Sequence, residues 1–123
     1  MMEIGIDILD IDRMCKLVDK ITFLNKYYSN TEIDYLCTLD PVNRAKAMAG
    51  YYSCKEAFLK AVGLGIGRGI DLKDISVEYS DLGKPFIVLS SKAKKIFNDF
   101  GFKKISVNIT DNKQVTVAVC LVY

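Results

Sequence analysis

Residues 53–67 read SCKEAFLKAVGLGIG, a helical pattern that runs into a glycine-rich loop. Apolar residues cover both sides of this predicted helix, which indicates that the helix is buried. The carboxylate of Glu56 is costly in such a place unless a cation, a metal ion or hydrogen bonds meet it. We therefore expect the rest of the chain to be arranged around this helix and to supply a partner for Glu56.

Two interpretations of Glu56 are open. In the first, Glu56 and Lys60, one helical turn apart, form an ordinary structural ion pair. In the second, the pair belongs to an anion site, because a run of glycines leaves backbone N–H groups free to approach an anion closely. These glycines are Gly63, Gly65, Gly67 and Gly69. They also have a plain explanation, since Gly63 can end the helix and a flexible loop can follow.

Length and composition predict one compact domain over residues 1–123, because half of the residues are hydrophobic. The net charge of +2 and the scattered basic residues argue against nucleic-acid binding. No apolar run is long enough to span a membrane, and no targeting segment opens the chain. The four cysteines lack CxxC spacing. We expect buried, reduced thiols in a cytoplasmic protein.

The sequence contains no histidine. Histidine is the commonest general base and a common metal ligand, so its absence removes every Ser-His or Cys-His nucleophile arrangement. Any chemistry must use carboxylates, lysines, backbone amides or a hard metal ion.

The first residues predict a strand followed by a helix. Residues 2–9 alternate, with Ile4, Ile6 and Ile8 on one face, as in a half-buried strand. Asp7, near the end of this strand, is either a capping residue or a functional carboxylate. From Ile11 an amphipathic helix is expected, with the inward residues Met14, Cys15, Val18 and Ile21 and the exposed basic residues Arg13, Lys16 and Lys20. Most such basic faces are merely solvated.

Later signals predict the remaining elements. Residues 29–32 read SNTE, a capping box that starts a short helix. Asp40 and Pro41 start the long helix that ends at Gly63. A hairpin is expected over residues 75–89, a helix after Ser90 or Ser91, and strands at 105–110 and 115–122. The helix after Ser90 should point Ala93, Ile96, Phe97 and Phe100 inward.

Three motifs, in order and spacing, resemble the holo-[acyl-carrier-protein] synthase family of small 4′-phosphopantetheinyl transferases. They are GIDI at residues 5–8 followed by Arg13, KEAFLKAVGLG at 55–65, and GKP at 83–85. The resemblance extends from about residue 2 to the final strand. It implies an α+β, 4′-phosphopantetheinyl transferase-like fold, with a small antiparallel sheet packed on a long central helix. It also implies a homotrimer whose active sites lie between neighbouring subunits.

The resemblance implies transfer of the 4′-phosphopantetheine arm of coenzyme A to a serine of apo acyl carrier protein. The reaction depends on Mg²⁺, releases adenosine 3′,5′-bisphosphate and serves fatty acid biosynthesis. By motif position, Asp7 and Glu56 would be the metal ligands, and Lys60 would contact the phosphates and assist the leaving group. Gly63 and Gly65 would line the coenzyme A site, and Gly83, Lys84 and Pro85 would border its adenine end. Arg13, with Lys16 and Lys20, would face the carrier protein.

Two positions depart from the family pattern. Tyr51 stands where members usually carry arginine, and residues 106–110 read SVNIT where members have Ser-x-(Ser/Thr)-His. The missing histidine falls on Ile109 or Thr110. Ser106 and Thr110 either donate neutral hydrogen bonds to a coenzyme A phosphate or are ordinary polar residues of an exposed strand face.

Two alternatives to an active transferase therefore stay open. The first is a catalytically impaired family member that binds or assembles with a carrier protein or coenzyme A. The second is another magnesium-dependent nucleotide-binding domain, which would not explain the basic first helix.

Overall fold

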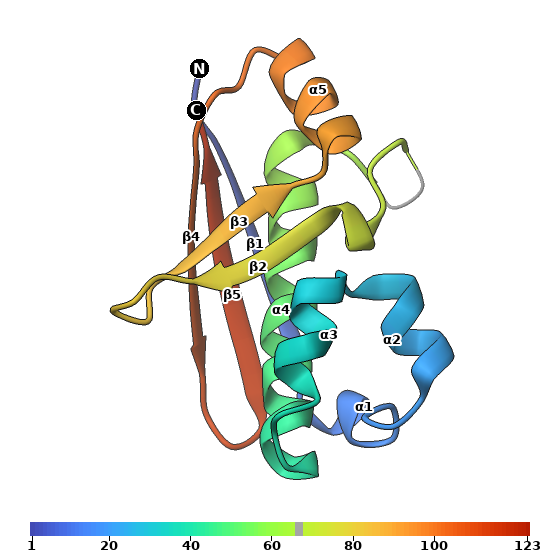
Figure 1. Ribbon diagram of the computed structural model, residues 1–123. Helices are drawn as coiled ribbons and strands as arrows, with labels where there is room; N and C mark the ends of the chain where they lie inside the picture. Colours follow the sequence, from blue (N-terminus) through green and yellow to red (C-terminus); the bar gives the residue numbers. More distant parts are fainter. Residues whose placement is uncertain (66–67) are drawn as a thin grey trace.

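The computed structural model describes residues 1–65 and 68–123. Along the chain, the elements are β1 (Glu3–Asp10), α1 (Asp12–Cys15), α2 (Ile21–Tyr27), α3 (Asn30–Leu36), α4 (Pro41–Val62), the 3-10 turn η1 (Leu72–Asp74), β2 (Ile75–Tyr79), β3 (Pro85–Leu89), α5 (Ser91–Asp99), β4 (Ile105–Asp111) and β5 (Val115–Val122). Figure 1 shows how they surround α4. Among the described residues, no helix has both the length and the apolar character needed to cross a membrane.

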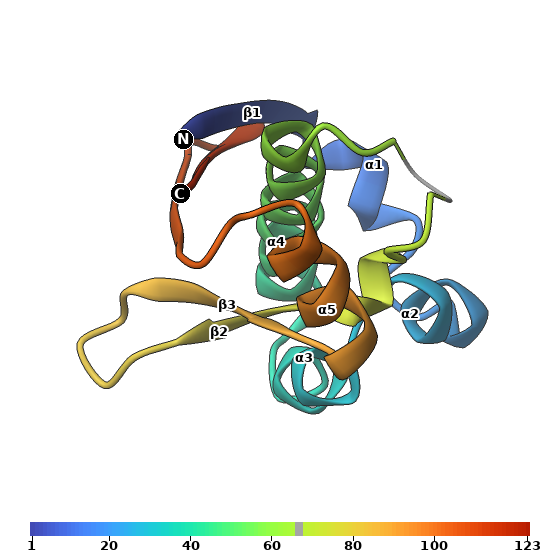
Figure 2. The ribbon, with the colours of Figure 1, turned by 90° about the horizontal axis from the view of Figure 1, so that it is seen from above.

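The long helix α4 is the middle layer of the molecule. An antiparallel sheet of order β1-β5-β4 packs on one side of it. The antiparallel hairpin β2–β3 and the short helix α3 lie on the other side, as the view from above shows (Figure 2). The predicted α+β class, with a small antiparallel sheet on a long central helix, is confirmed.

Helix ends follow the local signals. The Asp40 carboxylate accepts a hydrogen bond from the Asn43 N–H (3.0 Å) at the start of α4, and Gly63 ends α4 with φ of 86°. At α3, the Glu32 N–H donates to Ser29 Oγ and the Ser29 N–H donates to Glu32 Oε1, at 3.1 and 2.8 Å. These are the capping box and the left-handed glycine cap that the sequence predicts.

The first helix is shorter than predicted. Instead of one amphipathic helix from Ile11 to Ile21, the chain forms the single turn α1, a series of turns, and then α2. Arg44 of α4 provides the physical reason, because its Nη1 binds the Val18 carbonyl (3.3 Å) and the Asp19 carboxylate (2.8 Å). A carbonyl held by Arg44 is drawn away from an i→i+4 helical partner, and Ile21 is exposed at the start of α2.

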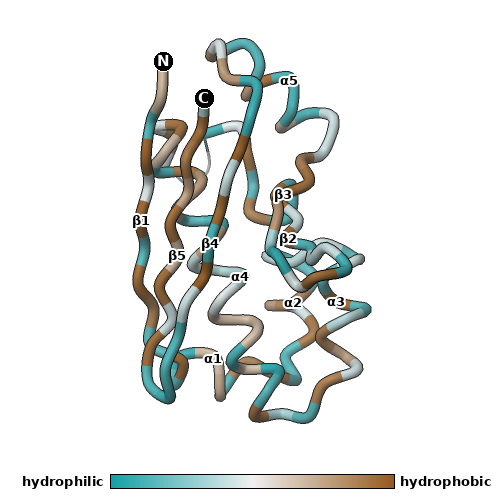
Figure 3. Tube along the Cα trace, turned by 90° about the vertical axis from the view of Figure 1, so that its left-hand side faces the viewer, coloured by the Kyte–Doolittle hydropathy of each residue, from teal (hydrophilic) through white to brown (hydrophobic). Residues whose placement is uncertain are grey.

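The buried face of β1 is the opposite of the expected one. Gly5 and Leu9 face α4 and are buried, whereas Ile4, Ile6 and Ile8 are 65, 61 and 64% exposed. A Cβ on Gly5 would lie 1.9 Å from the Ala57 carbonyl oxygen, so only glycine allows β1 to approach α4 this closely. Figure 3 shows alternating hydrophobic and hydrophilic positions along β1. The three isoleucines of this strand face outward.

Two further expectations on burial need correction. Cys54 and Cys120 are buried as predicted, but Cys15 and Cys37 are exposed, because the short helices α1 and α3 end where these residues lie. Phe100 is 46% exposed because α5 ends at Asp99. Its expected place in the core is taken by Phe102, whose ring stacks on Phe97 at 5.6 Å between centroids.

Candidate active site

Asp7 and Lys60 meet where β1 crosses α4. Lys60 Nζ donates to Asp7 Oδ1 at 3.1 Å and to the Ile6 carbonyl at 3.0 Å. Ser53, on the same helix, donates its hydroxyl to the Asp7 carbonyl at 3.0 Å. These contacts and the close approach at Gly5 hold Asp7 against the helix face that carries Lys60. Asp7 therefore pairs with Lys60 in the structure and does not cap a helix, since Ile11 is the N-cap of α1.

Glu56 belongs to the same cluster of charges. Burial raises its pKa most, the negative charge of Asp7 raises it further, and the positive charge of Lys60 lowers it. Lys60 forms its ion pair with Asp7, so the simple Glu56–Lys60 pair is not the one in the structure. We call Asp7, Glu56 and Lys60 the charged cluster.

The charged cluster fits a hard divalent cation. Its two carboxylates approach closely enough to repel each other, and Mg²⁺ prefers carboxylate oxygens. No group of three or more acidic, thiol or imidazole side chains gathers anywhere in residues 1–65 and 68–123. Asp7 and Glu56 are therefore the two carboxylates that this cluster offers to a metal ion, which suits an ion that keeps several waters and binds substrate phosphates.

Arg13 of α1 lies near this cluster. Tyr52 of α4 senses the charges of both regions. Burial is the main cause that raises the pKa of its phenol, the charges of Glu56 and Asp7 raise this pKa further, and the charge of Arg13 lowers it. Its ring packs against Phe23 and Tyr27 of α2, with centroids 6.5 and 5.9 Å away. Arg13, Lys16 and Lys20 are all exposed. Of the three, Arg13 is the residue whose charge reaches Tyr52 beside the charged cluster.

The glycine-rich loop begins as a helix cap. The Gly63 N–H already donates to the Leu59 carbonyl at 2.9 Å, so the plain explanation of a helix cap holds for this residue. Gly65 is exposed, and Gly67 lies outside the described residues. Gly63 and Lys60 share a hollow of about 330 Å³ with Phe100 and Phe102.

The predicted adenine-end residues lie on the other side of α4 from the charged cluster. Gly83 and Lys84 lie in the turn of the β2–β3 hairpin, Pro85 is the first residue of β3, and Gly83 has φ of 83°. Gly83 borders a cavity of about 570 Å³ whose walls include three tyrosines, Tyr35, Tyr51 and Tyr79. Tyr51, which replaces the arginine of the family pattern, is buried against Tyr79 with centroids 6.0 Å apart.

Ser106 and Thr110 are also separated from Asp7 within one chain. Asp7 pairs with Ala118, and Ala118 pairs with Ile109, so these three side chains lie on the α4 face of the sheet. Ser106 and Thr110 alternate onto the outer face, on the strand at the far edge from β1. One chain alone therefore brings together Asp7, Glu56, Lys60, Gly63 and Arg13, but not the hairpin turn or β4.

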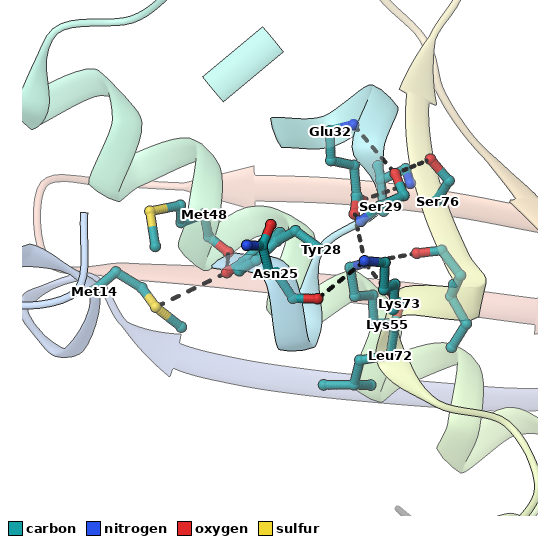
Figure 4. A network of polar contacts seen from close by, with 12 residues as sticks. Met14, Asn25, Tyr28, Ser29, Glu32, Met48, Lys55, Leu72, Lys73 and Ser76 are labelled. Carbon is teal, nitrogen blue, oxygen red and sulfur yellow. Dashed lines mark hydrogen bonds and ion pairs between the residues drawn. The ribbon is translucent and has the colours of Figure 1, made fainter. Parts of the chain in front are cut away.

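A buried ion pair that no sequence pattern indicates lies beside the site (Figure 4). Lys55 Nζ donates to Glu32 Oε1 at 2.6 Å and to the Leu72 and Ile75 carbonyls at 2.9 and 2.7 Å. The Val77 N–H donates to Glu32 Oε2 at 2.8 Å, and both charged side chains are fully buried. Lys55 precedes Glu56, so this pair fixes the helical turn that carries Glu56. The KEA motif and the capping box contain both residues, but neither pattern indicates that they meet.

Comparisons with known proteins agree with this architecture. The family model of the 4′-phosphopantetheinyl transferase superfamily matches residues 3–120. A holo-[acyl-carrier-protein] synthase of Syntrophus aciditrophicus is 38% identical over 119 residues, covering 95% of this chain and 91% of the relative. The Helicobacter pylori holo-[acyl-carrier-protein] synthase solved in complex with coenzyme A is 33% identical, with a TM-score of 0.83 over 98% of this chain and 99% of that chain. The Neisseria meningitidis synthase has a TM-score of 0.88 at 26% identity, over 98 and 97% of the two chains.

Proposed function

The chain belongs to the 4′-phosphopantetheinyl transferase superfamily, and we propose that it is an active holo-[acyl-carrier-protein] synthase. It moves the 4′-phosphopantetheine arm of coenzyme A to a serine of an apo acyl carrier protein of fatty acid biosynthesis. The observation that carries this proposal is the charged cluster, which combines two carboxylates and a lysine at the positions of the family motif. The four cysteines are free thiols, the form that a reducing cytoplasm maintains, and we place the enzyme there.

The reaction breaks a phosphoanhydride bond of coenzyme A and forms a phosphodiester bond to the serine. The serine oxygen bonds to the phosphorus that carries the pantetheine arm, and the bond from this phosphorus to the bridging oxygen breaks, so that adenosine 3′,5′-bisphosphate leaves. The Lys60 ammonium, one helical turn from Glu56, stabilises the negative charge that develops on the leaving oxygen. With no histidine in the chain, the serine proton passes to water or to the Glu56 carboxylate.

Asp7 and Glu56 are the residues that would hold Mg²⁺. Bound there, Mg²⁺ supplies charge neutralisation for the pyrophosphate oxygens of the donor. The contribution of the chain itself is placement, since Gly5, Ser53 and the buried Lys55 fix the strand and the helix that carry the two carboxylates. Accurate placement of reacting groups is a large part of catalysis in phosphoryl transfer.

Intact mass spectrometry tests the activity directly. The protein is incubated with Mg²⁺, coenzyme A and an apo acyl carrier protein, with matched samples that lack coenzyme A or contain a chelator. We expect the carrier protein to gain the mass of one phosphopantetheine moiety only in the complete mixture. An unchanged carrier mass over long incubation would contradict the proposal.

A second candidate function is supported by Tyr51 and the absent histidine. The cavity beside the hairpin turn is lined by tyrosines where the family pattern supplies an arginine, which weakens electrostatic attraction for a phosphate. Weaker attraction for phosphate is expected of a catalytically impaired protein that binds coenzyme A or a carrier protein without transferring the arm. It predicts measurable binding of either partner without the mass gain described above.

The proposed active form is a homotrimer in which neighbouring subunits complete each site. The apolar outer face of the sheet supports this proposal, because an exposed isoleucine stripe on β1 continues into the half-buried Val117 and Val119 of β5. The hairpin turn 83–85, Ser106 and Thr110 lie far from Asp7 in one chain. In the proposed trimer they belong to the site of a neighbouring subunit.

An aspartate on the outer face should break the trimer. Ile6→Asp places a charge at the centre of the apolar stripe, and burying it against another subunit would be strongly unfavourable. We expect the mass measured by light scattering to fall from three chains to one. Val42→Asp, at an exposed apolar residue of α4, is the matched control and should leave the mass unchanged. A trimeric Ile6→Asp variant, or a monomeric wild type, would contradict this interface.

Reversing the charge of Arg13 should weaken recruitment of an acidic carrier protein. Exposed charges contribute to orientation and association rate more than to tight binding, so we expect Arg13→Glu to raise the Michaelis constant for the carrier by about tenfold. The constant for coenzyme A should hardly change. Added salt should reproduce the effect on wild type, because exposed charges are screened beyond about 8 Å at physiological ionic strength. Lys104→Glu makes the same charge change at the segment before β4 and should have little effect.

A further inference from the structure

Lys60 is bound to Asp7 in the structure, although the proposed reaction needs both groups for other partners. We propose that Lys60 makes metal binding depend on the donor. Its ammonium competes with free Mg²⁺ for Asp7, and it leaves Asp7 when the pyrophosphate of coenzyme A arrives. This inference rests on the proposed function and concerns the order in which the site is filled.

The competition follows from the contacts of the ammonium group. Lys60 Nζ lies 3.1 Å from Asp7 Oδ1 and 3.0 Å from the Ile6 carbonyl, so it occupies the carboxylate oxygen that faces the helix. A cation that binds Asp7 must share this carboxylate with a positive charge at hydrogen-bond distance. The repulsion between the two cations weakens the binding of Mg²⁺ on its own.

The lysine is the partner that is able to move. The side chain of Lys60 is 55% exposed, whereas that of Asp7 is 15% exposed and lies between β1 and α4. Because the Lys60 ammonium is exposed, water can solvate it as it leaves the ion pair. When the ammonium leaves, water can replace it at the Ile6 carbonyl, because β1 is the edge strand of its sheet. The carboxylate itself stays in place, since the Ser53 hydroxyl and Gly5 fix its strand.

The charges explain why the donor reverses the competition. Asp7, Glu56 and Lys60 together carry one negative charge, which Mg²⁺ alone would convert into one positive charge. The pyrophosphate adds about two negative charges and attracts the Lys60 ammonium to its own oxygens. Mg²⁺ then meets Asp7 without a competing cation. Metal and donor should therefore bind cooperatively, and by linkage each should strengthen the other by the same factor.

Calorimetric titration of Mg²⁺ tests this coupling without any turnover. Wild type and Lys60→Met are titrated with Mg²⁺ alone and with coenzyme A present, in the absence of carrier protein and at constant ionic strength. For wild type we expect coenzyme A to tighten Mg²⁺ binding by about tenfold or more. Lys60→Met keeps the length of the side chain without its charge. It should bind Mg²⁺ alone about fivefold more tightly than wild type and show little further gain with coenzyme A.

Lys92→Met is the matched control. Lys92 also forms exposed ion pairs, with Asp71 at 3.5 Å and Asp74 at 3.3 Å, but it is on α5, away from the charged cluster. Its loss should leave both titrations unchanged. Circular dichroism of each variant verifies that the helices are intact.

Three outcomes would overturn the proposal, and they separate it from the proposed function. If Lys60→Met and wild type bind free Mg²⁺ equally, or if coenzyme A does not change the Mg²⁺ affinity of wild type, Lys60 does not couple metal to donor. The carrier mass gain would then still establish the transferase activity. If wild type binds no Mg²⁺ in either titration and transfers nothing, both the coupling and the proposed function are wrong.

Discussion

Replacing Glu56 by glutamine is expected to abolish magnesium-dependent transfer while α4 remains folded. Glutamine keeps the shape of the side chain but removes the charge that the metal ion requires. Mutation of a residue that only orients a metal ligand already lowers metal affinity or activity by about 10–100-fold. Loss of a ligand itself should therefore reduce the rate by more than about 100-fold. The rate is measured from the carrier mass gain with time.

The stability of Glu56→Gln should equal or exceed that of wild type. Burial and the neighbouring Asp7 both disfavour the charged form of Glu56, as its raised pKa indicates, so a neutral side chain relieves an unfavourable charge. Glu3→Gln, at an exposed carboxylate of β1, is the control and should transfer at the wild-type rate. A Glu56→Gln enzyme as fast as wild type would show that Glu56 does not hold the metal.

Replacing Lys55 by methionine is expected to destabilise the protein by about 3–5 kcal/mol, the usual cost of leaving one partner of a buried ion pair uncompensated. The variant leaves the Glu32 carboxylate without its cation and removes a donor from the Leu72 and Ile75 carbonyls. These contacts join α3, α4, η1 and β2. The loss is measured by urea unfolding at one fixed protein concentration, because oligomers unfold in a concentration-dependent way.

A double variant separates the ion pair from packing. Adding Glu32→Gln to Lys55→Met removes the buried negative charge and keeps an oxygen for the Ser29 N–H, but its amide NH2 then faces the Val77 N–H, so the double variant should recover part of the lost stability. Lys95→Met, at an exposed i,i+4 pair with Asp99 at 2.8 Å, should change stability by less than about 0.5 kcal/mol. A loss below about 1 kcal/mol for Lys55→Met would mean that the buried pair does not hold these elements together.

The sequence predicts which residues form the candidate site but not which of them bind each other. The motif spacing identifies Asp7, Glu56 and Lys60, and the structure brings all three together. The motif spacing does not indicate that Lys60 binds Asp7 rather than Glu56, because this pairing depends on where β1 crosses α4. The buried Lys55–Glu32 pair joins residues 23 positions apart, so no local pattern reveals it.

The sequence alone determined the features that depend on near neighbours in the chain. The capping box of α3, the Asp40 and Pro41 start of α4 and the left-handed Gly63 at its end each involve residues within four positions, so short-range sterics and hydrogen bonds decide them. The length and burial of α4 follow in the same way from its apolar periodicity. The motif order also sufficed to indicate the family.

The tertiary structure decided which face of each element meets the core. Alternation along β1 indicates that Ile4, Ile6 and Ile8 share a face, but it does not specify which face packs on the helix. Close packing decides this, because the missing side chain of Gly5 is what allows β1 to touch Ala57 and Ala61. The same contact turns Asp7 toward Lys60 and leaves the isoleucines outward. The short first helix has a similar origin, since Arg44, 26 positions from Val18, binds its carbonyl.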